Sequence, residues 1–313
     1  MLIDTHCHVS FEAYKNDAEY VVKRALDADV KMITVGTRIE TSRAALAFAE
    51  AHEGVWATVG LHPGHVHAQD FVDANEMPSG MTGSNPIGKP SDAVAARHMA
   101  EAFDPEVYRA MLAHPKVVAV GECGLDYYRL PPGISAEQMK EDQKVAVRAQ
   151  LRLASEAGKP VVIHCRNAAS APSISPLAGG EARSAHQDQA EMIREEIAAG
   201  GLARRGLIHC FTGTAEEAAM YAELHFLVAF GGILTFGKNV AEAARVIPLE
   251  QIVLETDAPY LTPAPFRGKR NEPVHVRLVA EKLAALKGVS VGEIERVTTA
   301  NAIRLFGLTK MGE

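Results

Sequence analysis

The chain has 313 residues, a formal net charge of −7 and hydrophobic residues at 47% of its positions. This length allows one large domain or two ordinary ones. The acidic balance argues against a protein that holds nucleic acid through a broad basic surface, but not against a short strand gripped in one local site. The longest apolar runs are strand-like and too short for a transmembrane helix, and no signal peptide is visible, so we expect no membrane contact.

Short β-branched runs alternate with alanine-rich amphipathic stretches along the whole sequence, which is typical of repeated βα units and a parallel sheet. Strands are predicted at residues 2–8, 31–36, 55–60, 117–122, 160–164, 206–210, 227–231 and 252–257. Helices are expected at residues 18–28, 41–51, 137–157 and 215–224, with Gly158 as a stop signal. Eight parallel strands with eight crossovers close naturally into a (β/α)8 TIM barrel, so we predict an α/β fold with a single domain over residues 1–313.

Two segments interrupt this alternation. Residues 75–92 and 168–187 are rich in Gly, Pro and small polar residues and show no periodicity, so both are predicted to be loop insertions. They follow the third and fifth predicted strands, on the face where barrel active sites are built. They are expected to wall or gate the site, although passive insertions are an equally open interpretation.

Candidate metal ligands stand at the C-terminal ends of five predicted strands. In the first strand, His6 and His8 share a face because successive side chains alternate. The complete set is His6, His8, Glu122, His164, His209 and Asp257. Four imidazoles and two carboxylates converging on one barrel mouth can hold two divalent ions, whereas one isolated residue of this kind would be an ordinary buried polar group.

We predict that His6, His8 and Asp257 bind one ion, that His164 and His209 bind the other, and that Glu122 bridges the two. Mixed imidazole and carboxylate ligation suits Zn²⁺, Mn²⁺ or Fe²⁺, and Mg²⁺ less comfortably. A metal lowers the pKa of bound water enough to make hydroxide near neutral pH. Glu122 and Asp257 are therefore the predicted catalytic carboxylates, with Asp257 accepting the proton of the nucleophile.

Further residues are predicted around these ligands. Arg166 shares a face with His164 and suits a phosphate or carboxylate, while His62 either contacts the scissile phosphate or only lines the pocket. Asp4 and Glu255 are expected beneath the metals, orienting histidine ligands, or else as ordinary interior carboxylates. Three cations in the last loop are predicted to bind phosphates, with solvated surface charge as the alternative: Arg267, Lys269 and Arg270.

Each of the four cysteines directly follows a candidate ligand. They are Cys7, Cys123, Cys165 and Cys210. If the ligands point into the barrel mouth, alternation sends all four thiols outward under the helices, where they act as small apolar residues. Free thiols and the missing signal peptide together suggest a cytoplasmic protein.

The motifs resemble the TatD family of metal-dependent hydrolases. They are Asp4-Thr5-His6-Cys7-His8, Gly60-Leu61-His62-Pro63, Val120-Gly121-Glu122-Cys123-Gly124-Leu125-Asp126, Ile163-His164-Cys165-Arg166, His209-Cys210-Phe211-Thr212-Gly213, Glu255-Thr256-Asp257-Ala258-Pro259-Tyr260-Leu261, Arg267-Gly268-Lys269-Arg270-Asn271-Glu272-Pro273 and Asn301-Ala302-Ile303-Arg304-Leu305-Phe306. The resemblance implies an amidohydrolase-superfamily barrel with a two-metal site. It also implies Mg²⁺-, Mn²⁺- or Zn²⁺-dependent cleavage of DNA phosphodiester bonds by a 3′-to-5′ exonuclease acting on single strands or 3′ ends.

Two departures from the family pattern are visible. Asn167 stands where the family usually carries an acidic residue, so the charge beside the site differs there. The insertions at 75–92 and 168–187 are longer than the usual connections, which leaves the substrate range open.

Two alternatives remain open. Members resembling this family are also associated with removing D-amino acids from mischarged tRNA, and the superfamily hydrolyses other small esters and amides. The cationic loop favours a polyanionic substrate, such as DNA or a charged tRNA, over a neutral one. A non-catalytic, metal-stabilised binding protein is least favoured, because it would have no use for a complete hydrolytic ligand set.

Overall fold

The computed structural model describes residues 1–69, 73–76, 100–169 and 183–308. In these ranges eight parallel strands follow one another in chain order, each hydrogen-bonded to the next. The strands are β1 (Leu2–Cys7), β2 (Val30–Val35), β3 (Val55–Val59), β4 (Val117–Asp126), β5 (Val161–Arg166), β6 (Gly206–His209), β7 (Leu227–Phe230) and β8 (Ile252–Leu254). The predicted α/β barrel is therefore confirmed.

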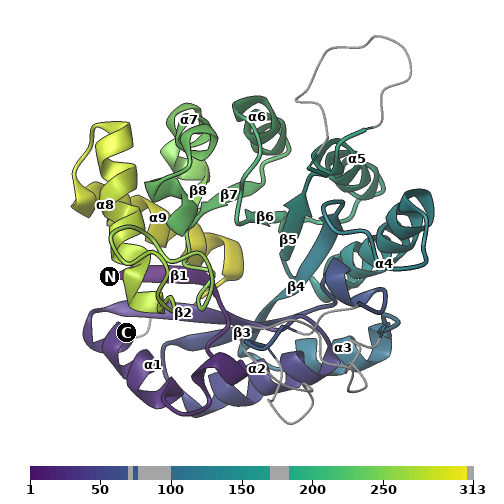
Figure 1. The fold of residues 1–313 in the computed structure, drawn as a ribbon, viewed down its shortest axis with the longest axis horizontal. Helices are drawn as coiled ribbons and strands as arrows, with labels where there is room; N and C mark the ends of the chain where they lie inside the picture. Colours follow the sequence, from purple (N-terminus) through teal and green to yellow (C-terminus); the bar gives the residue numbers. More distant parts are fainter. Residues whose placement is uncertain (70–72, 77–99, 170–182, 309–313) are drawn as a thin grey trace.

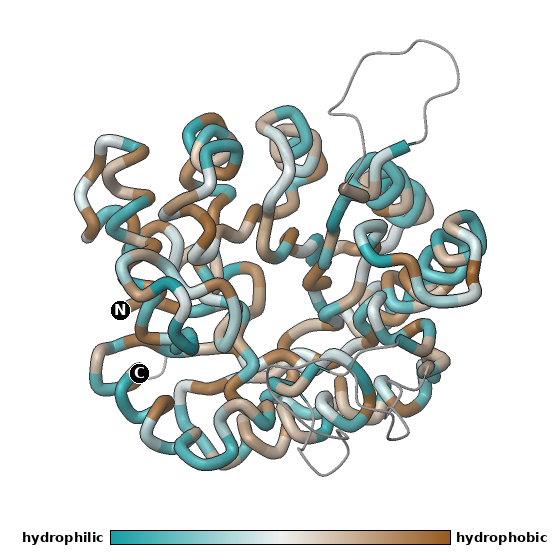
Figure 2. The backbone as a smooth tube through the Cα atoms, in the orientation of Figure 1, coloured by the Kyte–Doolittle hydropathy of each residue, from teal (hydrophilic) through white to brown (hydrophobic). Residues whose placement is uncertain are grey.

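Helices surround the strands on the outside (Figure 1). They are α1 (Ala18–Asp27), α2 (Ile39–Ala51), α3 (Pro105–Leu112), α4 (Ala136–Ala157), α5 (Ala185–Ala198), α6 (Ala215–Glu223), α7 (Lys238–Val246), α8 (Val276–Lys287) and α9 (Val291–Phe306). Hydrophobic and hydrophilic residues alternate along the peripheral helices, as the period of an amphipathic helix requires (Figure 2). The stop predicted for α4 is confirmed, since Gly158 ends that helix in the left-handed conformation.

Backbone hydrogen bonds between β1 and the segment that follows β8 bring the first and last strands together. His8 N donates to Ala258 O at 2.7 Å, and Asp257 N donates to His6 O at 2.9 Å. Cys7 and Ala258 form a parallel bridge at the same place. This closure puts the first and last ligand-bearing segments side by side, although they are about 250 residues apart in the sequence.

Two apolar layers hold the barrel. An outer layer packs the strands against the surrounding helices. An inner layer fills the barrel itself with residues such as Ile33, Trp56 and Val162, and it packs against Leu305 and Phe306 of α9. Because α9 contacts β1 and β8 and completes this inner layer, the C-terminal helix is part of the core.

Three element boundaries differ from the sequence predictions by three residues or more. β4 extends four residues past Glu122 to Asp126, whereas β8 ends at Leu254, so Asp257 lies in the following loop with a positive φ of 58°. The loop predicted over 168–187 is too long at its end, because Ser184 caps α5 by accepting a hydrogen bond from Gln187 N. Most of both predicted insertions lies outside the described residues.

No helix in the described part of the chain has both the length and the apolarity needed to span a membrane.

Candidate metal centre and active-site pocket

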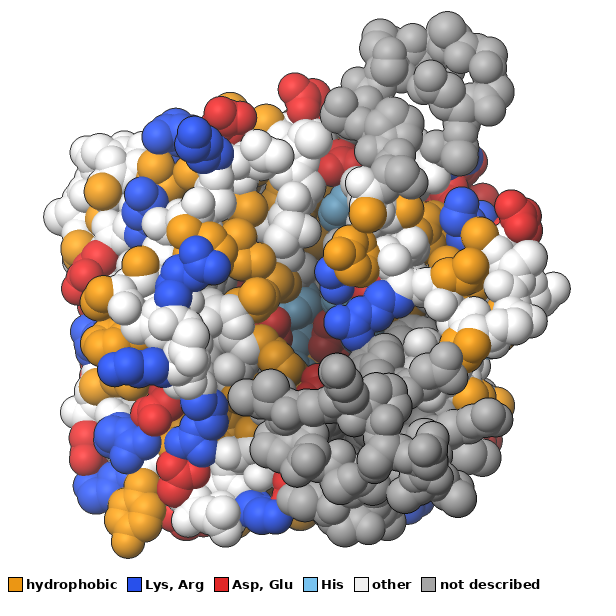
Figure 3. Space-filling view, in the orientation of Figure 1, with side chains coloured by type: hydrophobic (Ala, Val, Ile, Leu, Met, Phe, Trp, Pro, Cys, Tyr) orange, Lys and Arg blue, Asp and Glu red, His pale blue; other side chains and the backbone are white. Residues whose placement is uncertain are grey.

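The C-terminal ends of the strands surround a pocket of about 510 Å³. This volume falls in the range of roughly 300–1,000 Å³ typical of small-ligand sites. Histidine and acidic side chains lie inside a hollow near the centre of the face in Figure 3, with cationic and hydrophobic side chains around it. The lining includes His8, His62, Glu122, Asp126, Arg129, His164, Arg166, His209 and Asp257.

His6, His8 and Asp257 form one compact group at the closure of the barrel. The Nε2 atoms of His6 and His8 are 3.3 Å apart, and Asp257 Oδ1 lies 3.5 Å from His8 Nε2. His8 Nδ1 is 2.9 Å from Val35 O, a contact in which Nδ1 must donate. In its neutral form the His8 ring therefore presents the lone pair of Nε2 to the group, which is the arrangement of a metal ligand.

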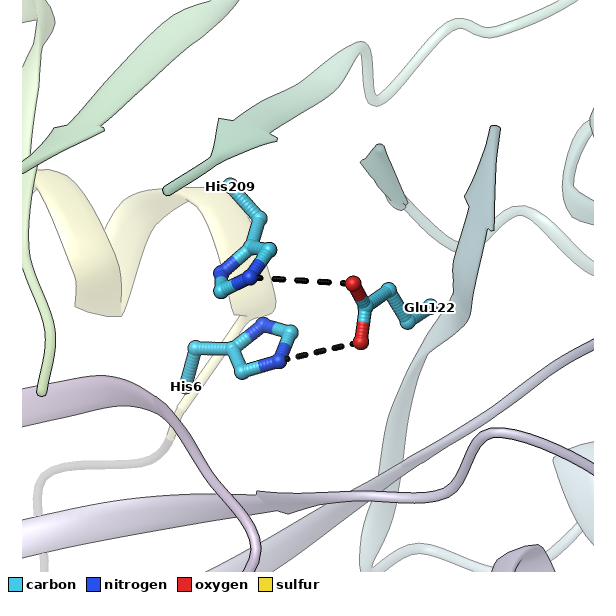
Figure 4. A group of neighbouring side chains, drawn as sticks. All are labelled: His6, Glu122 and His209. Carbon is cyan, nitrogen blue, oxygen red and sulfur yellow. Dashed lines mark ion pairs between the residues drawn. The ribbon is translucent and has the colours of Figure 1, made fainter. Parts of the chain in front are cut away.

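Glu122 stands between this group and the imidazoles of β5 and β6. Its Oε2 lies 3.3 Å from His6 Nε2, while its Oε1 lies 3.0 Å from His164 Nδ1 and 3.6 Å from His209 Nε2. The carboxylate thus turns one oxygen to His6 and the other to His209 (Figure 4). A carboxylate in this position has the geometry that can join two cations.

His209 is oriented from behind by a buried carboxylate. Its Nδ1 donates to Glu255 Oε2 at 3.0 Å, so Nε2 faces Glu122 and Asp257. Glu255 also accepts a hydrogen bond from Cys210 N at 2.6 Å. The orienting position predicted for Glu255 therefore corresponds to a direct contact with a candidate ligand.

Asp4 has the contacts of the second alternative, a hydrogen-bonded interior carboxylate. Its carboxylate accepts hydrogen bonds from Thr256 N at 2.9 Å, from Thr256 Oγ1 at 2.5 Å and from His6 N at 3.3 Å. It therefore contacts backbone and a hydroxyl rather than a histidine ring. Asp4 positions the segment that carries Asp257 by tying it to β1.

His164 lies between two carboxylates, one of which sequence reasoning did not single out. Its Nδ1 faces Glu122, and its Nε2 lies 3.2 Å from Asp126 Oδ2. Asp126 is four residues beyond Glu122, so side-chain alternation would have placed it on the same face if β4 had been predicted at its full length.

His62 lies 3.6 Å from Glu122 Oε1 through Nε2, and its Nδ1 accepts a hydrogen bond from Gly64 N at 3.0 Å. Burial lowers the pKa of His62 to about 3, so its imidazole is neutral. With Nδ1 occupied as an acceptor, the proton resides on Nε2. His62 is thus a hydrogen-bond donor in the pocket, although it is close enough to Glu122 and His164 to belong to a ligand-like group.

The electrostatics of the cluster favour a cation. Burial opposes the charge on Glu122, but the surrounding imidazoles, His209 foremost, hold the pKa of this carboxyl well below its usual range. Burial likewise opposes protonation of His209, but the carboxylates around it, led by Glu255, raise its pKa to about 10. Hydrogen bonds to Asp126 and Glu122 overcome burial and raise the pKa of His164 to about 9.

The residues present fit a divalent cation. The rings of His6 and His209 stack with centroids 3.4 Å apart, an arrangement that two protonated imidazoles would oppose by charge repulsion. Three groups of these side chains place all their ligand atoms within 4.8 Å of one another: His6, His8 and Asp257; His6, Glu122 and His209; and His62, Glu122 and His164. Imidazole nitrogens and carboxylate oxygens are donors that Zn²⁺ and Mn²⁺ accept.

The predicted substrate cations divide between the pocket and the surface. Arg166 lines the pocket together with Arg129, which sequence reasoning did not single out. In the last loop, Arg270 is held by the protein itself, since its guanidinium pairs with Asp17 and donates to Ala13 O. Arg267 and Lys269 are exposed and lie against the rings of Phe236 and Phe266, respectively.

A polar wall on the β2 and β3 side was not predicted. Thr37 Oγ1 donates to Glu76 Oε1 at 2.5 Å, and His65 Nε2 lies 3.1 Å from the same oxygen. Tyr260 donates to Asp73 at 2.8 Å across the pocket rim. These residues line the pocket. They belong to separate loops, so no pattern in the sequence predicts that they lie together.

The structure agrees with the cysteine prediction for Cys7 and Cys123, agrees in part for Cys165, and differs from it for Cys210. Cys7, Cys123 and Cys165 are buried in the outer apolar layer. Cys165 also borders the pocket, and Cys210 lines it with its ligand atom within 4.8 Å of those of His209 and Asp257. Alternation fails there because β6 ends at His209 and Cys210 adopts a positive φ of 44°.

Comparison with known proteins gives matches over nearly the whole chain. A family model described as TatD related DNase matches residues 3–307. The chain is 35% identical over 309 residues to an uncharacterized metal-dependent hydrolase, YabD, of Bacillus subtilis (strain 168), with 98% of this chain and 99% of that protein covered. It is 31% identical over 316 residues to the 3′-5′ ssDNA/RNA exonuclease TatD of Pantoea ananatis, with 98% and 100% covered.

Solved structures show the same architecture. The crystal structure of YJJV, a TatD homolog from Escherichia coli K12, superposes with a TM-score of 0.73 at 26% sequence identity, covering 98% of each chain. The phosphotriesterase homology protein of Escherichia coli gives a TM-score of 0.54 at 14% identity, again covering 98% of each chain, which is a likeness of fold.

Proposed function

This chain belongs to the TatD family of metal-dependent hydrolases, and we propose that it hydrolyses phosphodiester bonds of single-stranded nucleic acid, removing nucleotides from the 3′ end. The observation that carries the proposal is one pocket in which a hydrolytic imidazole–carboxylate cluster lies beside two arginines, Arg129 and Arg166. A phosphodiester needs both, because its charge must be bound while its phosphorus is attacked. A neutral ester or amide, by contrast, presents no negative charge for Arg129 and Arg166 to bind.

We propose that His6, His8 and Asp257 would hold one divalent cation, that His164 and His209 would hold a second, and that Glu122 would join them. Support comes from the contacts of Glu122, whose two oxygens face different imidazoles. Such cations, when bound, lower the pKa of water and neutralise charge on a phosphoryl oxygen.

The remaining steps fall to side chains of this protein. Asp257 takes the proton of the attacking water. Burial opposes the charge on its carboxyl group, but the nearby His209 and His8 keep its pKa below the ordinary value. The side chain is therefore an ionised carboxylate, which is the form that can accept a proton. The neutral imidazole of His62 donates a hydrogen bond from Nε2–H to a phosphoryl oxygen and keeps its proton. Arg166 binds the phosphate and draws it toward the cluster. The free thiols of the four cysteines suit the reducing cytoplasm in which we place this reaction.

The proposal is tested by stripping the protein of metal and restoring Mg²⁺, Mn²⁺ or Zn²⁺ in turn. The substrate is a single-stranded oligonucleotide with a 5′ label, alongside the same strand with its 3′ end blocked. We expect stepwise shortening of the open strand and resistance of the blocked one. Asp257→Asn should abolish the shortening, whereas Asp27→Asn, on an exposed part of α1, should not.

Absence of cleavage with every metal would refute the nuclease proposal. Deacylation of a D-aminoacyl-tRNA without cleavage of DNA would also refute it, because the same cluster would then hydrolyse an ester bond and not a phosphodiester bond. Cleavage of the blocked strand would refute the proposal that the enzyme starts at the 3′ end, but it would support the proposal that it hydrolyses phosphodiester bonds.

A further inference from the structure

Two exposed aromatic side chains lie near the pocket, and each carries an arginine over its ring. Tyr128 is 47% exposed, with Arg166 Cζ at 3.7 Å from its ring centroid. Phe236 is 39% exposed, with Arg267 Cζ at 3.9 Å from its ring centroid. An exposed ring face or guanidinium plane offers a surface on which a planar ligand can stack.

The Tyr128/Arg166 pair is connected to the candidate metal centre through Asp126. Tyr128 N donates to Asp126 Oδ1 at 2.8 Å, and the other oxygen of Asp126 contacts His164. Arg166 itself lines the pocket at the end of β5. A planar group resting on Tyr128 and Arg166 would therefore lie next to a phosphate bound at the cluster.

The second pair lies several strands further around the barrel. Phe236 follows a short turn after β7, and its N–H donates to Ile233 O at 3.0 Å. Ile233 lines the pocket, and Ala264 N donates to Thr235 Oγ1, which holds the loop that carries Arg267 against this turn. The two pairs thus stand on different sides of the same opening.

Building on the nuclease function proposed above, we infer that the Tyr128/Arg166 and Phe236/Arg267 pairs are stacking subsites for the two bases on either side of the scissile phosphate. Aromatic faces and guanidinium planes stack on any base, so such subsites bind without sequence preference. Each arginine also attracts a neighbouring phosphate, which compensates for the acidic character of the protein. Bases in a duplex are already stacked and paired, so the subsites select single strands.

Equilibrium binding of a short labelled oligonucleotide tests this inference, measured by fluorescence anisotropy in EDTA and again with the working metal. Tyr128→Ala and Phe236→Ala should each weaken binding by about 5- to 150-fold, the range expected for loss of one stacked base. Tyr128→Trp should restore binding, since stacking needs a ring and no hydroxyl. Tyr20→Ala is the matched control, because Tyr20 is a 68% exposed aromatic on α1 that does not line the pocket.

An oligonucleotide that lacks one base separates stacking from a general structural effect. Removing the base that occupies the Tyr128 subsite should cancel the loss caused by Tyr128→Ala, while the loss caused by Phe236→Ala persists. In cleavage assays the variants should raise KM much more than they lower kcat. Equal thermal unfolding midpoints should accompany these changes.

The outcomes distinguish this inference from the nuclease proposal. Normal binding by both alanine variants, in a protein that cleaves DNA, would overturn the stacking subsites and leave the nuclease function standing. Weakened binding by the variants of a protein that cleaves no oligonucleotide would support the subsites and overturn the nuclease function. Losses of the same size on intact and abasic strands would also overturn the inference.

Discussion

Replacing Asn167 by aspartate would put a second carboxylate against a buried one. Asn167 Nδ2 donates to Glu217 Oε1 at 3.1 Å, and the Glu217 side chain is 2% exposed. Ser184 Oγ and Thr214 N also donate to Glu217, so the carboxylate joins the end of β5 to the starts of α5 and α6. Asparagine supplies a donor at this point, which aspartate, the shortest acidic side chain, cannot do when ionised.

The cost of Asn167→Asp follows from the distance between the two groups. Unit charges 3.1 Å apart repel by about 5 kcal/mol at an effective dielectric constant of about 20. The new carboxyl can escape this repulsion by taking a proton, which costs about 4 kcal/mol at pH 7 for a group with an unfolded pKa of about 3.9. Because position 167 is only half-buried, we expect a loss of about 2–4 kcal/mol in the free energy of unfolding at pH 7.

The sign of the pH dependence is fixed by the same reasoning. The folded-state pKa of the new aspartate is raised, so its penalty grows as pH rises above about 4 and falls to no more than about 1.5 kcal/mol at pH 5. Urea unfolding of the wild type and Asn167→Asp at pH 5 and pH 7 measures this difference. Glu217→Gln should rescue the variant, because its amide can donate to the new carboxylate. Equal stability at both pH values, or no rescue, would refute this account.

Three further predictions concern the metal centre and the core. The pKa values of His164 and His209 are raised to about 9 and about 10, so metal binding at pH 7.5 should release a proton from each. The binding enthalpy measured by calorimetry should therefore change with the ionisation enthalpy of the buffer. Binding enthalpies that do not depend on the buffer would contradict this prediction. Asp126→Asn removes the carboxylate at His164 Nε2 and should weaken metal binding by about 10- to 100-fold in titration calorimetry, so an unchanged affinity would exclude an orienting role. Phe306→Ala should lower the free energy of unfolding by about 3–5 kcal/mol in urea, because it opens a cavity in the inner layer; a loss below about 1 kcal/mol would show that α9 is dispensable.

The sequence alone determined the barrel and the chemical type of its site. The period of two within strands and the alternation of strands with amphipathic stretches are local properties, so the eight strands could be predicted. The same periodicity predicted which side chains would share a face, as for His6 and His8. This periodicity failed in two places. The predicted end of β4 was too early, so Asp126 was not recognised, and the backbone leaves the strand conformation at Cys210.

The tertiary structure decided the individual pairings. Asp4, for which an orienting role and an ordinary interior role were both open, contacts Thr256. Arg270, predicted to bind phosphate or to be solvated surface charge, pairs with Asp17. The reason for an amide at position 167 is visible only in the structure, where Asn167 donates a hydrogen bond to Glu217. Each of these contacts joins segments between 50 and 253 residues apart. A local period sets the face on which a side chain lies, whereas its partner depends on how distant segments pack and on which donor or acceptor they leave within reach.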